Sequence, residues 1–229
     1  MKPYTYLLID VGCFLIPAIA SFYPEHPFYK EWKPFFFANF LIALLFLIWD
    51  ANFTQNEIWG FNTDYLVGLH IFNLPIEEIL FFISIPYACV FTYFALKYLI
   101  EKNPLEHYHR ILTLVLGIVL FVVGIFSLDK WYTSITFLLT AAYLFFRLIR
   151  RADLSEHYLA YFAILPFFFI SNGILTGSFL DAPIVWYNDE ENLGIRLFTI
   201  PIEDTIYGLL LILMNIDLYE FFKRKFLAN

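Results

Sequence analysis

The 229-residue sequence has few charged side chains, only two cysteines and no long basic run. Lys and Arg together number 14 against 21 Asp and Glu, so the formal net charge of −7 argues against nucleic acid as a partner. Cys13 and Cys89 lie inside apolar runs without C-x-x-C or metal-ligand spacing, so neither a disulfide framework nor a zinc site is indicated. The fingerprints G-x-G-x-x-G and the P-loop are missing, which removes the usual signals of nucleotide binding.

Apolar residues dominate what remains: 61% of the chain is hydrophobic and 22% is aromatic. A bilayer-spanning helix needs about 20 mostly apolar residues. Hydropathy predicts seven spans, with the second the shortest, near residues 4–22, 34–49, 76–99, 111–128, 131–149, 157–177 and 201–222. The sequence therefore predicts an all-α polytopic membrane protein, whose first span is retained rather than removed as a signal peptide.

The distribution of basic residues predicts the orientation of these spans. An odd number of spans places the two termini on opposite sides of the membrane. Of the 14 Lys and Arg, three (Lys2, Lys130 and Arg196) fall on the N-terminal side and 11 on the other. Because cytoplasmic loops are enriched in Lys and Arg, we expect the N-terminus outside and the C-terminus in the cytoplasm, with the cell (inner) membrane as the location.

An internal repeat divides the chain into two related halves. Residues Gly68–Glu78 align without a gap on Gly194–Asp204, at a constant offset of 126, and Phe61-Asn62 keeps the same offset to Tyr187-Asn188. Such a repeat is typical of pseudo-symmetric membrane proteins with a site at the repeat interface. Spans one to three then correspond to spans five to seven, in parallel orientation because span four lies between them. The predicted units are a first repeat, a linker helix and a second repeat, over residues 1–100, 101–130 and 131–229.

Each half contains a pair of acids where an outer loop becomes a membrane helix, in the motifs Pro-Ile-Glu-Glu and Pro-Ile-Glu-Asp. Acids in a first helical turn also favour the helix dipole by about 0.3–1 kcal/mol, which is the structural explanation. Against it stands the duplication of the pair at the edge of the hydrocarbon, where ionisable groups are costly and by default indicate function. The candidate catalytic residues are Glu77, Glu78, Glu203 and Asp204.

The two acids of a pair cannot face one cavity equally, because neighbouring helix residues point about 100° apart. One acid of each pair is then catalytic and its neighbour supporting. Glu77 shares a helix face with Phe81, and Glu203 shares one with Tyr207. An acid beside an aromatic ring suits chemistry that protonates an apolar substrate and then shelters a cation. We therefore expect Glu77 and Glu203 to be the more sensitive to substitution.

The paired motifs, the two three-span halves and the linking span together resemble the small membrane lycopene cyclases in their fused two-repeat form. The resemblance covers essentially the whole chain, although Asp204 is shorter than its counterpart Glu78 and so departs from strict symmetry. It implies an intramolecular lyase or isomerase of carotenoid biosynthesis, which converts the linear ends of lycopene to β-ionone rings without net redox change. A carboxylic acid as proton donor, a second group as acceptor and aromatic walls are what this reaction requires.

The resemblance also implies a set of further site residues and partners. Candidate aromatic walls for the substrate are Trp49, Phe72, Phe81, Trp186, Phe198 and Tyr207. Candidate supporting polar residues are Asp50, Asn62, Asp64, His70, Asn188 and Arg196. The partners are lycopene or a related linear carotenoid reaching the site laterally from the lipid bilayer, and other enzymes of the carotenoid pathway. We expect no cofactor and no metal ion.

Two other classes of function compete with this interpretation. A proton-coupled transporter also uses repeated intramembrane acids, but its helices are typically broken by Gly or Pro at midplane in both halves. Here the matched prolines stand at span ends, while Pro17, Pro86 and Pro166 do not match at the offset of 126. A seven-helix scaffold without enzymatic activity leaves the duplicated acids unexplained.

Overall fold

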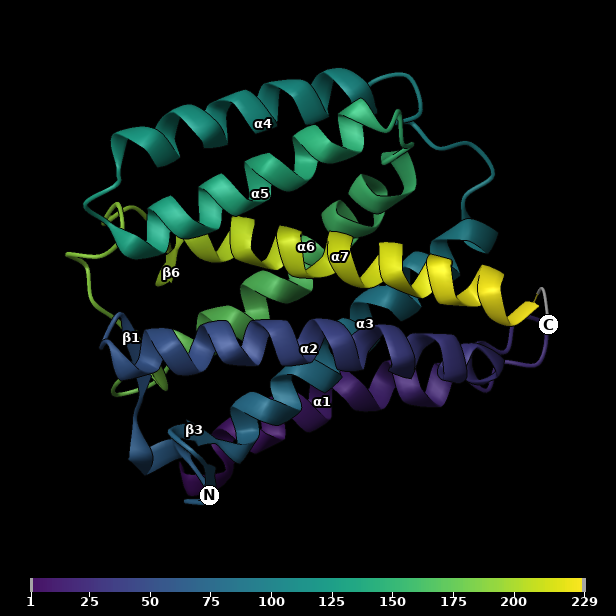
Figure 1. The fold of residues 1–229 in the computed structure, drawn as a ribbon. Helices are drawn as coiled ribbons and strands as arrows, with labels where there is room; N and C mark the ends of the chain where they lie inside the picture. The colour runs from purple at the N-terminus through teal and green to yellow at the C-terminus, as the bar shows by residue number, and fades with distance from the viewer. Residues whose placement is uncertain (1, 228–229) are drawn as a thin grey trace.

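A computed structural model describes residues 2–227, and seven helices in it are long and apolar enough to cross a membrane. Together with the composition, they identify an integral membrane protein of the all-α class, as the sequence predicts. The helices lie side by side in one bundle, with the two chain ends at opposite ends of it (Figure 1). They are α1 (Thr5–Ala20), α2 (Trp32–Gln55), α3 (Ile76–Leu99), α4 (His109–Phe126), α5 (Trp131–Ile149), α6 (Ser155–Leu175) and α7 (Ile202–Leu227).

The second helix differs most from its predicted span of residues 34–49. It runs for 24 residues and continues past Asp50 to Gln55. Hydropathy ends the span at Asp50 because a carboxyl group is costly in hydrocarbon. In the structure Asp50 is 1% exposed and accepts a hydrogen bond from the indole N–H of Trp59. Since this partner satisfies the acid inside the protein, the helix does not need to end there.

Short strands and 3-10 turns connect the helices, and most lie at the end of the bundle where α3 and α7 begin, which we call the motif end. The strands are β1 (Trp59–Phe61), β2 (His70–Ile71), β3 (Leu74–Pro75), β4 (Val185–Tyr187), β5 (Arg196–Leu197) and β6 (Ile200–Pro201). The 3-10 turns are Lys2–Tyr4, Phe28–Glu31 and Thr63–Tyr65. β1 pairs with β4 in antiparallel register, and Gly60 lies opposite Trp186. These two residues are also 126 positions apart, so the pair lies on the local two-fold axis that relates the repeats.

The helix packing repeats under the same axis. α1 packs on α3 as α5 packs on α7, and α2 packs on α7 as α6 packs on α3, with α3 and α7 in contact at the centre. α4 lies outside this arrangement, along α5 (Figure 1). The structure therefore contains two parallel three-helix repeats and one linker helix.

Close backbone approach holds the linker helix against α5. A Cβ added at Gly117 would come within 2.9 Å of the ring of Phe145, and one added at Gly124 within 2.8 Å of the side chain of Leu138. Small residues at such positions let membrane helices pack tightly, because association in lipid depends on van der Waals contact rather than on the hydrophobic effect. The two glycines thus explain why α4 packs on the second repeat.

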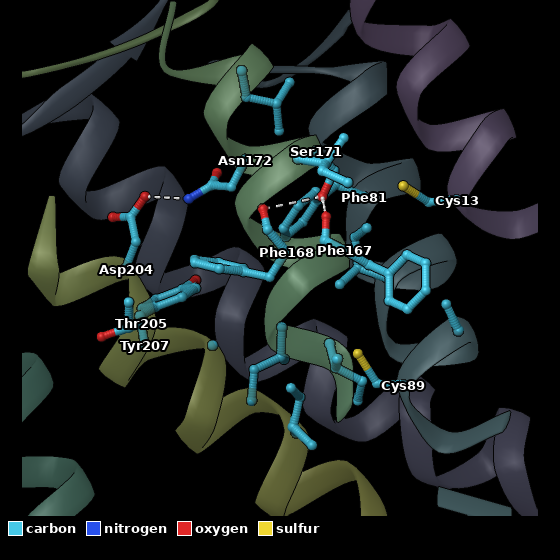
Figure 2. A pocket seen from close by; sticks show the side chains of 18 of the residues that line it. Cys13, Phe81, Cys89, Phe167, Phe168, Ser171, Asn172, Asp204, Thr205 and Tyr207 are labelled. Atoms are coloured by element: carbon cyan, nitrogen blue, oxygen red, sulfur yellow. Dashed lines mark hydrogen bonds between the residues drawn. The ribbon is translucent and has the colours of Figure 1, made fainter. Parts of the chain in front are cut away.

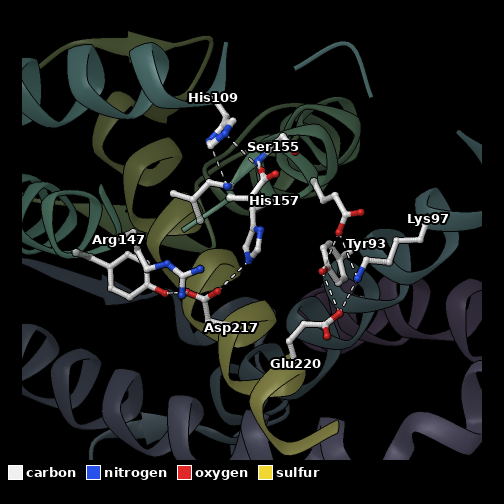
Figure 3. Close-up of polar contacts among 12 residues, drawn as sticks. Tyr93, Lys97, His109, Arg147, Ser155, His157, Asp217 and Glu220 are labelled. Atoms are coloured by element: carbon white, nitrogen blue, oxygen red, sulfur yellow. Dashed lines mark hydrogen bonds and ion pairs between the residues drawn. The ribbon is translucent and has the colours of Figure 1, made fainter. Parts of the chain in front are cut away.

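A polar network closes the opposite end of the bundle. Asp217 on α7 accepts from Arg147 of α5 at 2.5 Å and contacts the ring of His157 of α6 at 2.9 Å. Lys97 of α3 pairs with Glu220 of α7 at 2.7 Å (Figure 3). Each acid has a charged or ring-nitrogen partner, as burial of charge requires. The network ties four helices together at the end remote from the motif acids.

Candidate active site

A β-hairpin precedes each motif helix and fixes where its acids lie. In the first repeat His70 pairs with Pro75 and Ile71 with Leu74, and the strands β5 and β6 repeat this register. Each hairpin follows a glycine at positive φ, Gly68 at 91° and Gly194 at 69°. Glycine adopts this conformation without the steric cost that a side chain would add. Both loops therefore turn back over the first turn of the helix that follows them.

The first acid of each motif binds this loop. Glu77 and Glu203 are both 0% exposed. Glu77 accepts the backbone N–H of Val67 at 2.6 Å, and Glu203 accepts that of Leu193 at 2.8 Å. Glu203 also accepts the hydroxyl of Thr133 at 2.6 Å. Carboxylates that bind backbone amides in this way hold a loop in place.

The second acids, Glu78 and Asp204, line one shared cavity of about 420 Å³, which the first acids do not line. Figure 2 shows its wall from α6 and α7, with Asp204 and Tyr207 on one side and Cys13 of α1 on the other. The lining is predominantly apolar and aromatic, and it includes side chains from both repeats. A largely apolar pocket with a few convergent polar groups is the usual form of a small-molecule site.

A tyrosine donates to each of the cavity acids in the same way. The hydroxyl of Tyr6 on α1 donates to Glu78 at 2.5 Å, and that of Tyr132 on α5 donates to Asp204 at 2.5 Å. The two tyrosines are 126 residues apart, so this contact belongs to the repeat. It fixes the direction in which each acid points.

The remaining partners of the two acids differ. Glu78 shares a side-chain hydrogen bond with Asp50 of α2, a second carboxyl group. Asp204 instead accepts from the amide of Asn172 at 2.7 Å and from the hydroxyl of Tyr187 at 2.9 Å. Burial, together with the nearby Asp204, raises the pKa of Tyr187 well above its ordinary value, so this hydroxyl remains a donor.

The cavity opens to the lipid-facing surface between α1 and α6. Three of its lining side chains are also among the most exposed of the chain: Ile16 at 75%, Phe167 at 73% and Ile170 at 64%. Cys13 and Ser171, which interact across the two helices, lie beside them (Figure 2). We call this opening the α1–α6 mouth.

The symmetry-related gap, between α5 and α2, is filled. Tyr143 occupies the position that corresponds to Pro17 of the mouth and packs on a cluster that includes Ile42 and Phe46 of α2. Its hydroxyl also donates to Asp217. The repeat therefore provides an opening on one side of the cavity and a packed wall at the equivalent place on the other.

The structure separates the six aromatic residues that the sequence suggests as substrate walls. Phe81 and Tyr207 line the cavity. Trp49 packs on Tyr207, with ring centroids 5.0 Å apart, without itself lining the cavity, and Trp186 covers Gly60 on the two-fold axis. The other two, Phe72 at 95% exposure and Phe198 at 88%, project from the hairpin tips into the surroundings.

Of the six suggested polar residues, Asp50 lies at the cavity, and the other five lie in the connecting segments at the motif end. Asn62 and Asn188 accept backbone N–H groups two residues later, at 3.1 Å in both cases. Arg196 forms an ion pair with Asp189 at 2.5 Å. Asp64 forms one with Lys2 at 3.3 Å, and His70 lies exposed in β2.

Sequence reasoning missed several side chains that contact the acids or line the cavity. The polar ones are Tyr6, Trp59, Tyr132, Asn172 and Tyr187. The offset of 126 was a usable signal for one pair, because it aligns Tyr6 with Tyr132. Trp59 and Asn172 have no matching residue type in the other half, so the repeat could not reveal them.

Chemically, this arrangement places two differently partnered carboxyl groups against an apolar, aromatic space. Carboxyl groups within reach of a bound molecule can donate and accept protons, and ring faces such as those of Phe81 and Tyr207 attract positive charge. Within residues 2–227 no group of three or more His, Cys, Asp or Glu is arranged to hold a metal ion. The site is thus suited to acid–base chemistry on an apolar molecule.

Comparison with known proteins agrees with this chemistry. A family model described as lycopene cyclase matches residues 3–96 and 129–222. The two matched segments are themselves displaced by 126 residues, and α4 lies between them. No curated protein and no solved structure matches the chain. Since the family model covers most of the sequence in two repeats, the chain belongs to the lycopene cyclase family, whose members are enzymes that act on carotenoids.

Proposed function

We propose that this protein cyclises the linear ends of lycopene, or of a related linear carotenoid, to β-ionone rings. One observation supports this more than any other: Glu78 of the first repeat and Asp204 of the second line the same apolar cavity. The reaction needs a proton donor and a proton acceptor beside one apolar substrate end, and the two repeats supply one acid each.

The reaction balances without an oxidant or reductant. A carboxyl group donates a proton to the terminal double bond of the substrate, which leaves a tertiary cation. The electrons of the next double bond attack this cation, so that one carbon–carbon bond closes a six-membered ring and the positive charge moves into the ring. A carboxylate then removes a ring proton, whose electron pair becomes the new ring double bond. One proton enters and one leaves, so the reaction is an isomerisation.

Aromatic rings around the cavity suit the cationic intermediate. Phe81, Trp59 and Tyr207 line the cavity together with the acids, and Tyr207 lies 6.1 Å from Trp59 between ring centroids. Ring faces stabilise a desolvated cation by about 2 kcal/mol. Exclusion of water by the apolar lining also prevents addition of water to the cation, which would give an alcohol in place of a ring double bond.

The proposal gives Glu77 and Glu203 supporting roles, whereas the sequence predicts that they are the more sensitive acids of the two pairs. Both acids bind backbone amides of the loops and stay outside the cavity lining. In this proposal they position α3 and α7, while Glu78 and Asp204 exchange protons with the substrate.

Expression in a lycopene-accumulating cell, followed by pigment analysis, tests the function. We expect cyclic carotenoids with the wild-type chain and linear pigment with Glu78→Gln at equal membrane abundance. Purified protein in lipid, given lycopene in deuterated water without flavin, nicotinamide or metal, should form a ring that contains solvent deuterium. Linear pigment from abundant, membrane-inserted wild-type protein would reject the proposal and favour the competing transporter hypothesis.

The orientation of the chain belongs to the same proposal. With the N-terminus outside, the motif end and its acids face the outer side of the membrane, and the Arg147–Asp217 network faces the cytoplasm. Reporter fusions after Asn229 and within residues 178–192 should report opposite compartments. The same compartment for both fusions would contradict the seven-span topology.

A further inference from the structure

The two cavity acids have different partners, and the difference decides what each can do in a proton-transfer cycle. Glu78 contacts another carboxyl group, Asp50, through a side-chain hydrogen bond. The side chains that hydrogen-bond to Asp204 are all donors: Tyr132, Asn172 and Tyr187. The tyrosine contact is common to both acids, so the contrast lies in the other partners.

A hydrogen bond between two carboxyl groups requires a proton on one of them, because ionised carboxylates are acceptors only. Two like charges at such short range in an apolar site cannot both persist, which is why paired carboxyls hold one proton between them. Asp50 is further fixed by Trp59, whose indole N–H donates at 2.5 Å, and by a longer contact to Thr54 at 3.5 Å. The Asp50–Glu78 pair is therefore a store of one proton beside the cavity.

Asp204 has the opposite environment. Three donors from α5, α6 and the β4 strand point at its two oxygens, at 2.5, 2.7 and 2.9 Å. Hydrogen bonds donated to a carboxylate favour its charged form. Tyr187 does not give up its proton readily, since burial and the nearby Asp204 raise its pKa well above its ordinary value. These donors therefore favour an ionised Asp204, which can accept a proton.

Building on the proposed function, we propose that the Asp50–Glu78 pair is the proton donor of the cyclisation and that Asp204 is the proton acceptor. Glu78 delivers the shared proton to the terminal double bond, and Asp50 acts through Glu78 as a positioning residue that keeps the proton on the pair. Asp204 removes the ring proton that is lost when the ring double bond forms. Each turnover thus takes one proton from the Asp50–Glu78 pair and places a different proton, from the ring, on Asp204, and exchange with water restores both groups before the next turnover.

Isotope labelling separates the two roles. Purified variants in lipid receive lycopene in deuterated water. Glu78→Gln should lower deuterium uptake into recovered pigment more than about 100-fold, because no donor remains. Asp204→Asn should still incorporate deuterium but lose the normal ring, giving products whose double bond formed by loss of a different proton. Wild-type protein without any cyclic product would refute the proposed function itself. Two other results would refute only the assignment of roles, provided that the wild type cyclises lycopene. Either both variants fail equally to take up deuterium, or the results expected for the two variants are exchanged.

Asp50 has its own test. The titratable groups that face Glu78 are Tyr6 and Asp10 of α1, Asp50 of α2, Tyr187 of β4 and Tyr207 of α7. Asp50→Asn removes the neighbouring negative charge, so the upper pH limit of cyclisation should move to lower pH while the maximal rate at acid pH persists. Asp50→Glu should restore the limit toward that of the wild type.

The matched control is Thr176→Val, at the position that corresponds to Asp50 in the second repeat. This variant should leave the upper pH limit unchanged. An Asp50→Asn enzyme that is merely less abundant, or uniformly slower with an unchanged pH limit, would overturn the role of Asp50.

Discussion

The two repeats share a backbone and one tyrosine contact, but each has polar residues that the other lacks. Asp50 and Trp59 of the first repeat correspond to Thr176 and Val185 in the second. Two partners of Asp204 in the second repeat, Asn172 and Tyr187, likewise correspond to the apolar residues Phe46 and Phe61 in the first. Symmetry thus places one acid of each repeat at the cavity, and the unmatched residues give the two acids different hydrogen-bond partners. The duplicated backbone positions the two acids, and the residues that differ between the repeats determine what surrounds each acid.

The strongest test of this comparison is to remove the acids themselves. We expect Glu78→Gln and Asp204→Asn to lower formation of the normal ring by about 100-fold to 10,000-fold, as loss of a positioned acid or base does. Glu77→Gln and Glu203→Gln should cost less than about tenfold, because an amide oxygen still accepts the loop N–H. Pigment ratios at matched membrane abundance measure both. Equal losses from Glu77→Gln and Glu78→Gln would contradict the assignment.

Making the second repeat resemble the first should impair it. Asn172→Asp replaces a donor to Asp204 by a second carboxyl group, so Asp204 would share a proton instead of accepting one. A hydrogen bond to a charged group contributes about 1.5–3 kcal/mol, which corresponds to a rate loss of about 10-fold to 150-fold. Initial rates of ring formation in lipid give the result, with Asn172→Gln as the control that keeps an amide. An unaffected Asn172→Asp enzyme would show that the donors around Asp204 are unimportant.

The open and the filled sides of the cavity can be compared by a cross-link. Cys13 of α1 interacts with Ser171 of α6 at the mouth, so Ser171→Cys should allow oxidation to a disulfide that ties the two helices together. We expect the oxidised variant to cyclise lycopene at least about tenfold more slowly than its reduced form, since α1 and α6 could then not separate to admit the substrate. Wild-type protein treated with the same oxidant controls for Cys89. Full activity of the fully cross-linked protein would exclude the mouth as the substrate route.

The smallest expected effect concerns the loops of the second repeat. Burial opposes the shift, but hydrogen bonds from Arg196 and Asn192 hold the pKa of Asp189 below its ordinary value. The folded state therefore gains stability above the ordinary Asp pKa and loses it as the pH falls through the lowered value. For so exposed a pair the gain is at most about 1 kcal/mol. Arg196→Ala should accordingly lower the thermal stability slightly at neutral pH and not at strongly acidic pH. Equal destabilisation at both pH values would show that Arg196 acts by packing.

The sequence predicts much of this fold because the spans appear as runs of apolar residues and the repeat as a constant offset between similar segments. Seven spans, their order and the parallel halves follow from hydropathy and one offset. The end of α2 does not follow from hydropathy, because a hydropathy profile contains no information on the hydrogen bond that Trp59 donates to Asp50 inside the protein. The sequence also does not predict which acid of each pair faces the cavity. Both acids of a pair start a helix, and which one faces the cavity depends on how the hairpin sets the rotation of that helix.

The aromatic residues illustrate the same limit. Phe72 and Phe198 stand beside the motifs in sequence, yet the hairpin turns carry them outward at φ values of 55° and 59°. Tyr6 and Tyr132 stand far from the motifs in sequence and touch the acids in space. Contacts between helices that are distant in sequence are set by packing, which a single sequence does not display.

Under the proposed function, with substrate entering through the α1–α6 mouth, this opening has a kinetic consequence for a substrate with two identical ends. A linear carotenoid is about as long as the ~30 Å hydrocarbon core of a bilayer, so a cavity of about 420 Å³ holds one end while the rest stays in lipid. Once a ring has closed, that end must withdraw through the same opening, and the molecule must reverse before its other end can react. Between these two visits it competes with every unreacted chain nearby. The proportion of singly to doubly ringed product is then governed by how crowded the surrounding membrane is with linear pigment.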